Sequence, residues 1–412
     1  MDVTYPCCAG LDVHKETVAG CALWVDPHGK RQKEIATFGT TTRQLLALAD
    51  WLSQRKITHV AMESTGVYWK PIFNILEGTF TVLLVNARHI KQVPGRKTDI
   101  KDCEWIGDLL QHGLLKASFV PDRPQRDLRD LTRHRAQLVG EQTRVINRMQ
   151  KILEDANIKL ASVASNALGV SGRAMIQSLI RDDQTPEQMA DLARGKLRRK
   201  TAQLGEALQG HVTEHHRFML IELWGHLEYL EKAIAKFESR IEERTRPFAQ
   251  EIARLDEIPG VDRITAQAIL AEIGNDMSRF PTADHLASWA GVCPGNNESA
   301  GKRKSGKTTP GNRWLQRCLS QAAWASSHTK DTYLSAQFRQ IARRRGKKRA
   351  IIAVARTILI SAYYLLRDAV PYEELGGDYF DRINPERIRQ YHVRRLQKLG
   401  FVVTLQEAAP AA

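Results

Sequence analysis

Residues 5–25 read YPCCAGLDVHKETVAGCALWV, and this stretch decides the fold of the N-terminal part of the chain. It contains two apolar runs, at 5–13 and 17–25, which predict two strands separated by a short polar connection. A turn signal at 26–29 leads into a third strand-like run at 31–38. The sequence therefore predicts that the chain begins with a meander of three antiparallel strands.

After the meander, the hydrophobic pattern alternates between the period of a helix and that of a strand. This alternation is typical of an α/β domain, and it ends at a proline-rich break at 121–124, beyond which the pattern becomes helical. The predicted elements are a helix near 42–54, a strand at 59–62, a helix near 68–76, a strand at 81–85, a helix from 98 to about 112 and a short apolar piece at 117–120.

Four carboxylates stand at particular points of this predicted α/β domain. Asp12 lies inside the first strand, where burial of an unpaired charge is costly, and Glu63 ends the strand at 59–62. Asp99 and Asp102 are three residues apart, which places both on one face of the predicted helix. Taken singly, Glu63 is explained as a turn residue and Asp99 as a helix N-terminal residue. Together, the four acids form the oxygen-ligand set of a Mg²⁺ or Mn²⁺ site for phosphoryl transfer.

The 412 residues are enough for two or three domains, and 42% hydrophobic with 26% charged residues is ordinary for a globular protein. The longest apolar runs are too short for a bilayer span and the N-terminus lacks a signal-peptide pattern, so we expect a cytoplasmic protein with no membrane partner. Six scattered cysteines without a C-x-x-C pair are expected to be buried thiols. The net charge of +15 favours a polyanionic partner such as DNA or RNA.

Most of the net charge, +13 of +15, is concentrated in residues 302–349, which contain fourteen Lys and Arg and one acid, Asp331. Blocks of this kind are often solvated tails. Here the block is interleaved with Trp314, Trp324 and other aromatic residues and is followed by an apolar helix, which favours a folded nucleic-acid-binding domain. The candidate nucleic-acid contacts are Lys302, Arg303, Lys304, Lys307, Arg313, Arg343, Arg344, Arg345, Lys347, Lys348 and Arg349.

The middle of the chain contains three helical patterns, each with two interpretations. The basic helix at 125–160 has either a solvated face or a nucleic-acid-binding one. Apolar residues recur between 220 and 241 at alternating spacings of 3 and 4, the pattern of a coiled coil, which packs either within the chain or, as we favour, between protomers. The segment 255–270 has the form of a helix-hairpin-helix, whose Pro-Gly turn either faces a phosphate or serves as packing, and Asp262 disfavours the phosphate.

A second constellation surrounds Ser299, in the stretch AGVCPGNNESAGK at 290–302. A serine flanked by small residues and cations has the surroundings of a nucleophile towards a phosphodiester, and Lys302, Arg303 and Lys304 would stabilise charge on the phosphorus. No neighbouring His or Asp base is evident, so the spacing alone also allows a simple loop serine.

Three motifs, LDVHK at 11–15, MESTGVYW at 62–69 and GRKTDIKD at 95–102, closely resemble the DEDD-type insertion-sequence transposases, which are bridge-RNA-guided serine recombinases of bacterial mobile elements. The family commonly has Ser before its serine and Gly after it, where this chain has Glu298 and Ala300. The likeness continues through Ile258-Pro259-Gly260, Trp289-Ala290-Gly291, Ser299-Ala300-Gly301-Lys302 and Gly311-Asn312-Arg313, so it spans nearly the whole chain.

The strand order and the placement of the acids resemble the ribonuclease-H-like fold in its RuvC-like form. With the motifs, this likeness implies an α/β catalytic domain, a helical middle and a mainly helical C-terminal part. The predicted regions are a RuvC-like catalytic domain at 1–124, a helical and coiled-coil oligomerisation region at 125–250, a DNA- and RNA-binding transposase domain with the candidate serine at 251–370 and an extension at 371–412.

The resemblance also implies roles for individual residues and partners. It implies a homo-oligomer, dimer or tetramer, in which acids of one protomer and the serine of another form a composite site. It further implies a structured guide RNA that pairs with both donor and target DNA. Carried across position by position, Asp12, Glu63, Asp99 and Asp102 look like the Mg²⁺ ligands, and Ser299 looks like the nucleophile that joins covalently to DNA phosphate.

The leading expectation is therefore a transposase that cleaves DNA, forms a phosphoserine, exchanges strands and religates them. One alternative is a nuclease resembling a Holliday-junction resolvase, in which the four acids suffice, water attacks and Ser299 is structural. A second alternative is a nucleic-acid-binding protein without catalysis, which the intact set of four acids disfavours.

Overall fold

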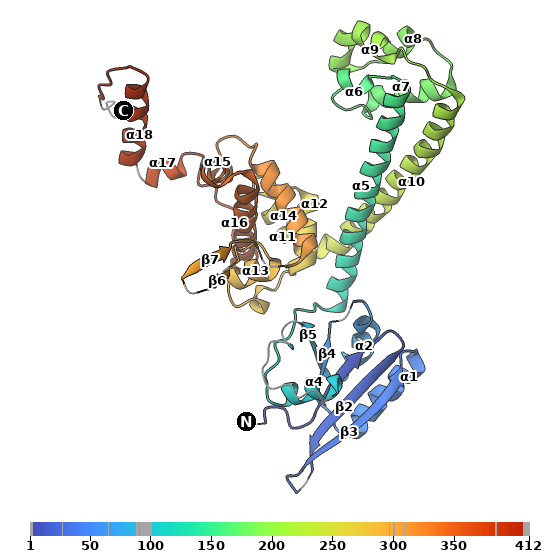
Figure 1. Cartoon of the computed structure of the whole chain (residues 1–412), viewed down its shortest axis with the longest axis vertical. Coiled ribbons are helices and arrows are strands. Elements are labelled where there is room, and N and C mark those ends of the chain that lie inside the picture. The colour runs from blue at the N-terminus through green and yellow to red at the C-terminus, as the bar shows by residue number, and fades with distance from the viewer. Residues whose placement is uncertain are drawn as a thin grey trace. The chain divides into compact units, whose positions relative to one another are not determined.

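The computed structural model describes residues 3–26, 28–64, 66–87, 90, 101–295, 297–299, 301–308, 310–383 and 385–406. For 297–299, 303–305 and 387 it describes the backbone only. The chain divides into two compact units, Met1–Pro121 and Asp122–Ala412, and each is described by itself. Figure 1 labels their helices and strands.

The first unit is built on a five-stranded mixed sheet with the order β3-β2-β1-β4-β5. The first three strands are antiparallel, and β4 and β5 run parallel to β1. All five lie where the sequence pattern predicts them. The strands are β1 (Cys8–Val13), β2 (Thr17–Val25), β3 (Arg31–Gly39), β4 (His59–Glu63) and β5 (Thr81–Val85).

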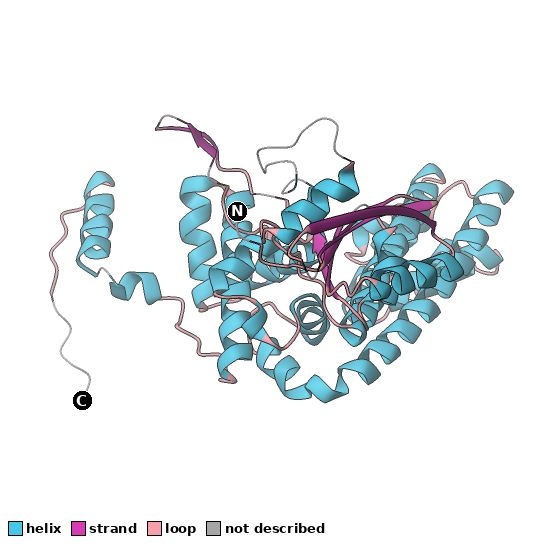
Figure 2. Ribbon diagram, turned by 90° about the horizontal axis from the view of Figure 1, so that it is seen from below, coloured by secondary structure: helices cyan, strands magenta, loops and turns pink. Residues whose placement is uncertain are grey.

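Helices cover both faces of this sheet (Figure 2). Because successive strand residues point to opposite faces, β1 contributes Leu11 to one side and Cys8 to the other. Leu11 packs in a core with α1 (Thr42–Gln54) and α2 (Trp69–Leu76), whereas Cys8 packs with α4 (Asp102–Gln111). The core of the unit therefore consists of two apolar layers, one on each side of the sheet.

The sequence predicts six buried cysteines, and the structure buries only three of them. Cys8, Cys21 and Cys103 are buried in the layer beneath α4, but Cys7, Cys293 and Cys318 are only half-buried, and all six are free thiols. Burial raises the pKa of Cys8 and of Cys21 to about 12, so both stay protonated at neutral pH.

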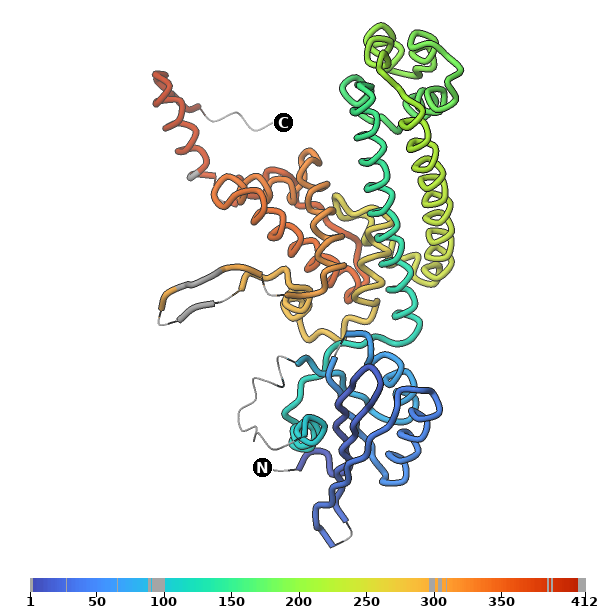
Figure 3. Tube along the Cα trace, turned by 45° about the vertical axis from the view of Figure 1, so that its right-hand side comes forward, coloured from blue at the N-terminus to red at the C-terminus, as the bar shows by residue number. Residues whose placement is uncertain are grey.

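The second unit begins with an arm made of two long helices, α5 (Arg123–Asp155) and α10 (Glu214–Thr245). They run antiparallel and side by side, as Figures 1 and 3 show. Leu220, Leu227 and Leu230 of the predicted coiled-coil seam are at most 1% exposed, because they pack against α5 of the same chain. The expectation that this seam joins protomers is therefore wrong, and the interpretation as a pair packed within the chain is correct.

The segment that connects the two arm helices folds into a small helical tip at the far end of the arm (Figures 1 and 3). Its apolar residues join the same core as the arm, including Met175 and Leu204. Its elements are α6 (Leu160–Val163), α7 (Val170–Arg181), α8 (Pro186–Ala190), the 3₁₀ helix η1 (Gly195–Lys200) and α9 (Thr201–Leu208).

A helical bundle follows the arm, with one two-stranded hairpin, β6 and β7, inserted into it. Within the bundle, the apolar helix α16 packs against α11, α13, α14 and α15. The elements are η2 (Arg246–Phe248), α11 (Ala249–Asp256), α12 (Arg263–Ile273), η3 (Met277–Arg279), α13 (Ala283–Ala290), β6 (Asn297–Ser299), β7 (Lys302–Ser305), α14 (Arg313–Ser326), α15 (Tyr333–Arg345) and α16 (Lys347–Asp368).

Among the described helices, α16 alone is long and apolar enough to cross a membrane by length and composition. Half of that apolar stretch is buried within the bundle, as in the central helix of a globular unit. Beyond it, α17 (Tyr379–Ile383) and α18 (Pro385–Lys398) form the C-terminal extension.

The predicted helix-hairpin-helix is formed by α11 and α12. Gly260 in its turn has a φ of +86°, and an added Cβ would lie 2.4 Å from the carbonyl oxygen of Ala322 in α14. Asp262 caps α12 by accepting a hydrogen bond of 2.8 Å from the backbone N–H of Thr265. The turn therefore packs on α14 within the bundle, which supports the packing interpretation.

Candidate active site

Asp12 and Glu63 lie at adjacent ends of two neighbouring parallel strands. The pairing of β1 with β4 ends at Leu11 opposite Met62, so the next residue of each strand is one of these acids. Both acids share the face of the sheet that α4 covers, because Cys8 and Ala61, which precede them at even spacing, pack against that helix. Asp12 and Glu63, the two carboxylates that the sequence singles out on strands, therefore lie at the same end of the neighbouring strands and on the same face of the sheet.

Asp102 comes to the same end of these strands because α4 crosses β1 in close contact at Gly10. A Cβ on Gly10 would lie 2.2 Å from the carbonyl oxygen of Cys103 and 2.2 Å from the amide nitrogen of Gly107, so no other residue fits there. Asp102, the first residue of α4, directly precedes Cys103. Burial raises the pKa of the Cys103 thiol above its usual range, and the nearby negative charge of Asp12 raises it further.

The close crossing at Gly10 can be tested by filling it. We expect Gly10→Ala to lower the free energy of unfolding by about 1–3 kcal/mol, because the added methyl group displaces the backbone of α4. Gly39→Ala in β3 is the matched control, since its Cβ would come no closer to another atom than 3.4 Å, to the flexible side chain of Gln44. Urea unfolding of both full-length variants measures the difference, and equal stability would contradict the close crossing.

The fourth acid is not placed by the structure, and one part of its prediction is corrected. Asp99 falls at 91–100, outside the described residues. The helix α4 begins at Asp102, after an extended Lys101, and not near Thr98 as predicted. The periodicity that put Asp99 and Asp102 on one helix face was read across this boundary, so that part of the prediction is wrong.

The described acids supply hard oxygen donors that solvent can reach. The Asp12 side chain is 26% exposed, and its Oδ2 lies 3.0 Å from Nε2 of His14. Glu63 is half-buried and Asp102 is exposed. Within the described ranges, no three His, Cys, Asp or Glu side chains stand close enough together to hold a metal ion. The donor chemistry fits Mg²⁺, and its ligand set would also draw on Asp99.

Ser299 lies in the second unit, at the end of strand β6. It pairs with Lys302 of β7, and Gly301 in the connecting turn has a φ of +72°, which favours glycine. The serine therefore lies beside the turn of a two-stranded hairpin, rather than in an irregular loop.

Glycines fix the base of this hairpin by close backbone contacts. Gly295 donates an N–H to the carbonyl oxygen of Lys307 at 3.1 Å, and a Cβ at Gly295 would lie 2.2 Å from that oxygen. A Cβ at Gly311 would lie 2.4 Å from the carbonyl of Ala290, at the end of α13. Both ends of the segment that carries Ser299 are therefore held against each other and against the bundle.

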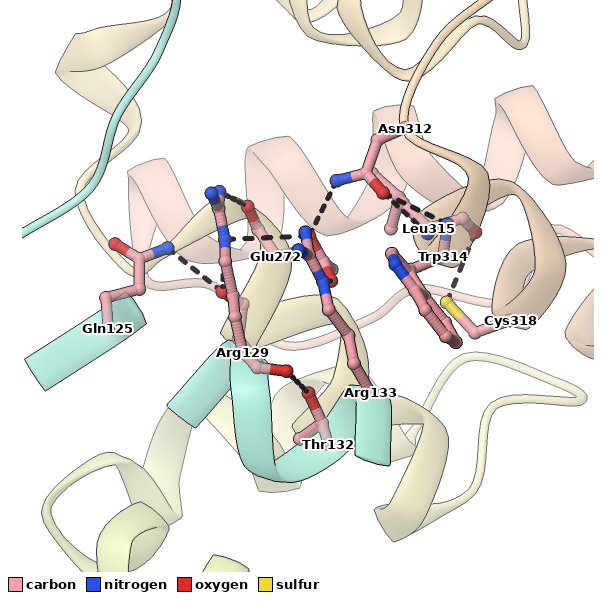
Figure 4. A network of polar contacts seen from close by, with 10 residues as sticks. Gln125, Arg129, Thr132, Arg133, Glu272, Asn312, Trp314, Leu315 and Cys318 are labelled. Carbon is pink, nitrogen blue, oxygen red and sulfur yellow. Dashed lines mark hydrogen bonds and ion pairs between the residues drawn. The ribbon is translucent and has the colours of Figure 1, made fainter. Parts of the chain in front are cut away.

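A buried polar network holds the adjoining motif Gly311-Asn312-Arg313 (Figure 4). Asn312 caps α14 by accepting from the N–H groups of Trp314 and Leu315, and its side-chain amide donates to Glu272 Oε2 at 2.6 Å. Glu272, in α12, is 2% exposed. The cap that starts α14 thus depends on a buried carboxylate of another helix.

Two arginines of α5 bind the same carboxylate (Figure 4). Arg133 forms a forked pair, with Nε and Nη2 at 2.7 and 2.8 Å from the two oxygens of Glu272. Arg129, only 8% exposed, donates to the backbone carbonyls of Ala271 and Glu272 and forms an ion pair of 3.5 Å with the carboxylate. Burial lowers the pKa of Arg129 to about 10, although Glu272 opposes the shift, so this arginine remains charged at neutral pH.

The network corrects the interpretation of two cations of the basic helix and adds a residue that the sequence prediction missed. Arg129 and Arg133 pair with the buried Glu272 and join the arm to the bundle. Arg144, Arg148 and Lys151 of the same helix are exposed, so both predicted interpretations remain for them. Glu272 was not singled out, although it is the one charge in the otherwise apolar end of α12 at 268–273. A lone acid on a buried helix face is the signal that would have identified it.

The predicted nucleic-acid contacts lie on the surface of the second unit wherever their side chains are described. Lys302, Lys307 and Arg313 are exposed near the hairpin. Arg303 and Lys304 belong to β7, but their side chains fall outside the described parts. Arg343, Arg344, Arg345, Lys347, Lys348 and Arg349 are all exposed where α15 ends and α16 begins.

Two transposase family models match this chain. A transposase model of the DEDD type from IS110 matches residues 9–158, which include β1, β4 and α4. A model described as the IS116/IS110/IS902 transposase family matches residues 252–339, which include the hairpin and the network at Glu272. Each candidate constellation therefore lies inside a matched segment.

Several proteins of insertion elements are similar to the chain over most of its length. A 43.6 kDa protein of insertion element IS110 from Streptomyces coelicolor is 27% identical over 68% of this chain and 73% of its own. A 42 kDa protein of IS900 from Mycobacterium paratuberculosis is 28% identical, over 71% of this chain and 80% of the length of that protein. The transposase for insertion sequence element IS1111A of Coxiella burnetii is 23% identical, over 84% of this chain and 85% of the length of that protein.

These likenesses define the class of the protein first: it is a transposase, an enzyme that transposes DNA. The matched segments then specify which transposases the chain resembles. It contains two domains of the IS110/IS116/IS902 transposase family, at 9–158 and 252–339.

Proposed function

We propose that this transposase cleaves and rejoins DNA through a covalent bond to Ser299, with Asp12, Glu63, Asp99 and Asp102 holding Mg²⁺. The observation that carries the metal assignment is the meeting of Asp12 and Glu63 at adjacent ends of β1 and β4, on the face where α4 starts with Asp102. This arrangement is typical of the RuvC-like form of the ribonuclease-H-like fold. A bound Mg²⁺ would stabilise charge that develops on the phosphate oxygens.

In the covalent step, the hydroxyl oxygen of Ser299 forms a bond to the DNA phosphorus while the bond to the leaving deoxyribose oxygen breaks. The hydroxyl proton reaches that oxygen through solvent. Reversal of the step with another strand end releases the serine and joins the strands. The position of Ser299 beside the hairpin turn, paired with the exposed Lys302, supports this role because a cation there would stabilise the negative charge of a phosphodiester.

A structured guide RNA and the donor and target DNA are the proposed partners, and the exposed cations of the bundle are their proposed contacts. The guide RNA and a composite site shared between protomers follow from the family resemblance. Since the arm seam is covered within the chain, contacts between protomers would use other surfaces.

Removal of the divalent cation tests the metal assignment. We expect chelation by EDTA to abolish strand cleavage of element-end DNA in the presence of the element's flanking RNA, and Mg²⁺ or Mn²⁺ in excess to restore it. Binding of the same DNA, measured in parallel, serves as the control because the candidate contacts lie in the second unit. Undiminished cleavage in EDTA would contradict the assignment.

Neutralising the exposed arginines of α15 tests the nucleic-acid interface. We expect Arg343→Gln, Arg344→Gln and Arg345→Gln together to weaken binding to all sequences and to reduce the slope of log K against log salt by about 2–3, as loss of phosphate contacts does. Binding titrations of two unrelated duplexes at several salt concentrations measure both effects. Loss of affinity for only one of the sequences would instead indicate base recognition.

A further inference from the structure

The tip of the arm carries a second cluster of cations, apart from those of the bundle. Residues 194–200 read RGKLRRK, which is five cations in seven residues, and no acid occurs between 192 and 205. We name Arg194, Lys196, Arg198, Arg199 and Lys200 the tip cluster. All five are exposed.

Acids do not neutralise the cations of the tip cluster. In this fully described part of the chain, none of its five side chains forms an ion pair. Four cations near it do have an acid partner, and these pairs are Lys159 with Glu154, Arg173 with Glu231, Arg181 with Asp183 and Arg217 with Asp182. Five unneutralised charges so close together repel one another, which favours an anionic ligand.

The cluster is held on an ordered scaffold. Ala193, before it, is 2% exposed, and Leu197, within it, packs against the core of the tip. The backbone N–H of Arg194 donates to Ser171 Oγ at 2.9 Å, and Lys200 Nζ donates to the carbonyl of Val163 at 3.2 Å. The charges are therefore presented by a fixed 3₁₀ helix, so little further ordering of the backbone accompanies binding.

The chemistry around the cluster selects among anionic ligands. No Phe, Tyr or Trp occurs between 156 and 213, so the tip cluster carries none of the large aromatic side chains on which unpaired bases commonly stack. Contacts to a phosphodiester backbone need only cations of this kind and do not depend on sequence. From these observations we infer that the tip cluster is a second nucleic-acid site, which binds the phosphate backbone of a duplex without reading its sequence.

The arm sets the distance between this site and the bundle. From Arg133, which is bound to Glu272 of the bundle, to Asp155 at the end of α5 there are 22 residues. At about 1.5 Å per residue this is roughly 33 Å. One duplex that touches both sites must therefore span on the order of 10 base pairs at about 3.4 Å each. The inference rests on the proposed function only in taking nucleic acid as the ligand, and it needs neither the metal nor Ser299.

A set of charge-matched variants of the full chain tests the inference. The test variant combines Arg194→Gln, Lys196→Gln and Arg199→Gln, and it leaves Arg198 and Lys200, which donate to backbone carbonyls. The control combines Lys159→Gln, Arg181→Gln and Arg240→Gln, which removes the same charge from cations that are already paired with acids. Binding to a 30-base-pair DNA duplex and to a 30-base-pair RNA duplex is titrated in EDTA at several salt concentrations.

We expect the test variant to bind at least one of the two duplexes about tenfold or more weakly, with a salt slope lower by about 2–3, and the control to change by less than about threefold. Loss with DNA alone, RNA alone or both identifies the backbone that the tip contacts. Unchanged binding of both duplexes would overturn the inference, as would an equal loss in the control. A changed oligomeric state in sedimentation with unchanged binding would overturn it in favour of a protein partner. Because these titrations measure binding and not cleavage, failure here is distinct from failure of the serine mechanism.

Discussion

Asp12→Asn should reduce strand cleavage by about a thousandfold or more while leaving DNA binding intact. The substitution keeps the size of the side chain but removes one negative charge from the site where the ends of β1 and β4 meet the start of α4. Metal-assisted stabilisation of a phosphoryl-transfer transition state is worth several kcal/mol, and each 1.4 kcal/mol is about a factor of ten in rate. Cleavage of element-end DNA, compared with binding of the same DNA, measures the effect.

Asp50→Asn is the matched control for this experiment. Asp50 is an exposed acid of α1, on the opposite side of the sheet, so its neutralisation changes the net charge equally without touching the proposed metal site. We expect cleavage by this variant to equal that of the wild type. Full activity of Asp12→Asn, or an equal loss in both variants, would remove the metal assignment.

The second large effect is expected at Glu272. Its carboxylate is buried and pairs with Arg129 and Arg133 while accepting from Asn312. Glu272→Gln leaves two arginines without their counter-charge, and removal of one partner from a buried ion pair costs about 3–5 kcal/mol. We expect the free energy of unfolding of the full chain to fall by this amount, as measured by urea denaturation with tryptophan fluorescence.

Glu238→Gln provides the comparison for Glu272. Glu238 also pairs with an arginine of α5, Arg135, at 2.5 Å, but its side chain is 42% exposed. Ion pairs that solvent reaches contribute about 0.2–1 kcal/mol, so this variant should lose little stability. If both variants were destabilised equally, the buried network would not be what fixes the arm to the bundle.

The sequence predicted the first unit well because its signals are local. Strand alternation and turn residues gave the five strands within a few residues, and Glu63 lies at the end of β4 as expected. Parallel pairing then brings Asp12 beside Glu63 by the geometry of the sheet. The prediction for Asp99 and Asp102 was weaker, because helical periodicity does not mark where a helix begins.

The second unit contains contacts that no local pattern specifies. A 3-4 spacing between Leu220 and Ile241 identifies an apolar stripe, but the partner of the stripe, α5, lies about 80 residues earlier in the chain. The network joins Arg129, Glu272 and Asn312, which are far apart in the sequence. A basic helix face is equally compatible with solvent, nucleic acid or a buried acid, and only the fold decides among them.

In the proposed reaction, DNA becomes covalently joined to Ser299. The most direct measurement is to incubate the full-length protein with Mg²⁺, the element's flanking RNA and labelled donor and target DNA, to denature the mixture and to map any protein–DNA adduct by peptide mass. We expect an adduct on the peptide that carries Ser299 and none with Ser299→Ala. Cleavage without an adduct would favour attack by water, as in a resolvase, and an adduct on another residue would contradict the assignment of the nucleophile.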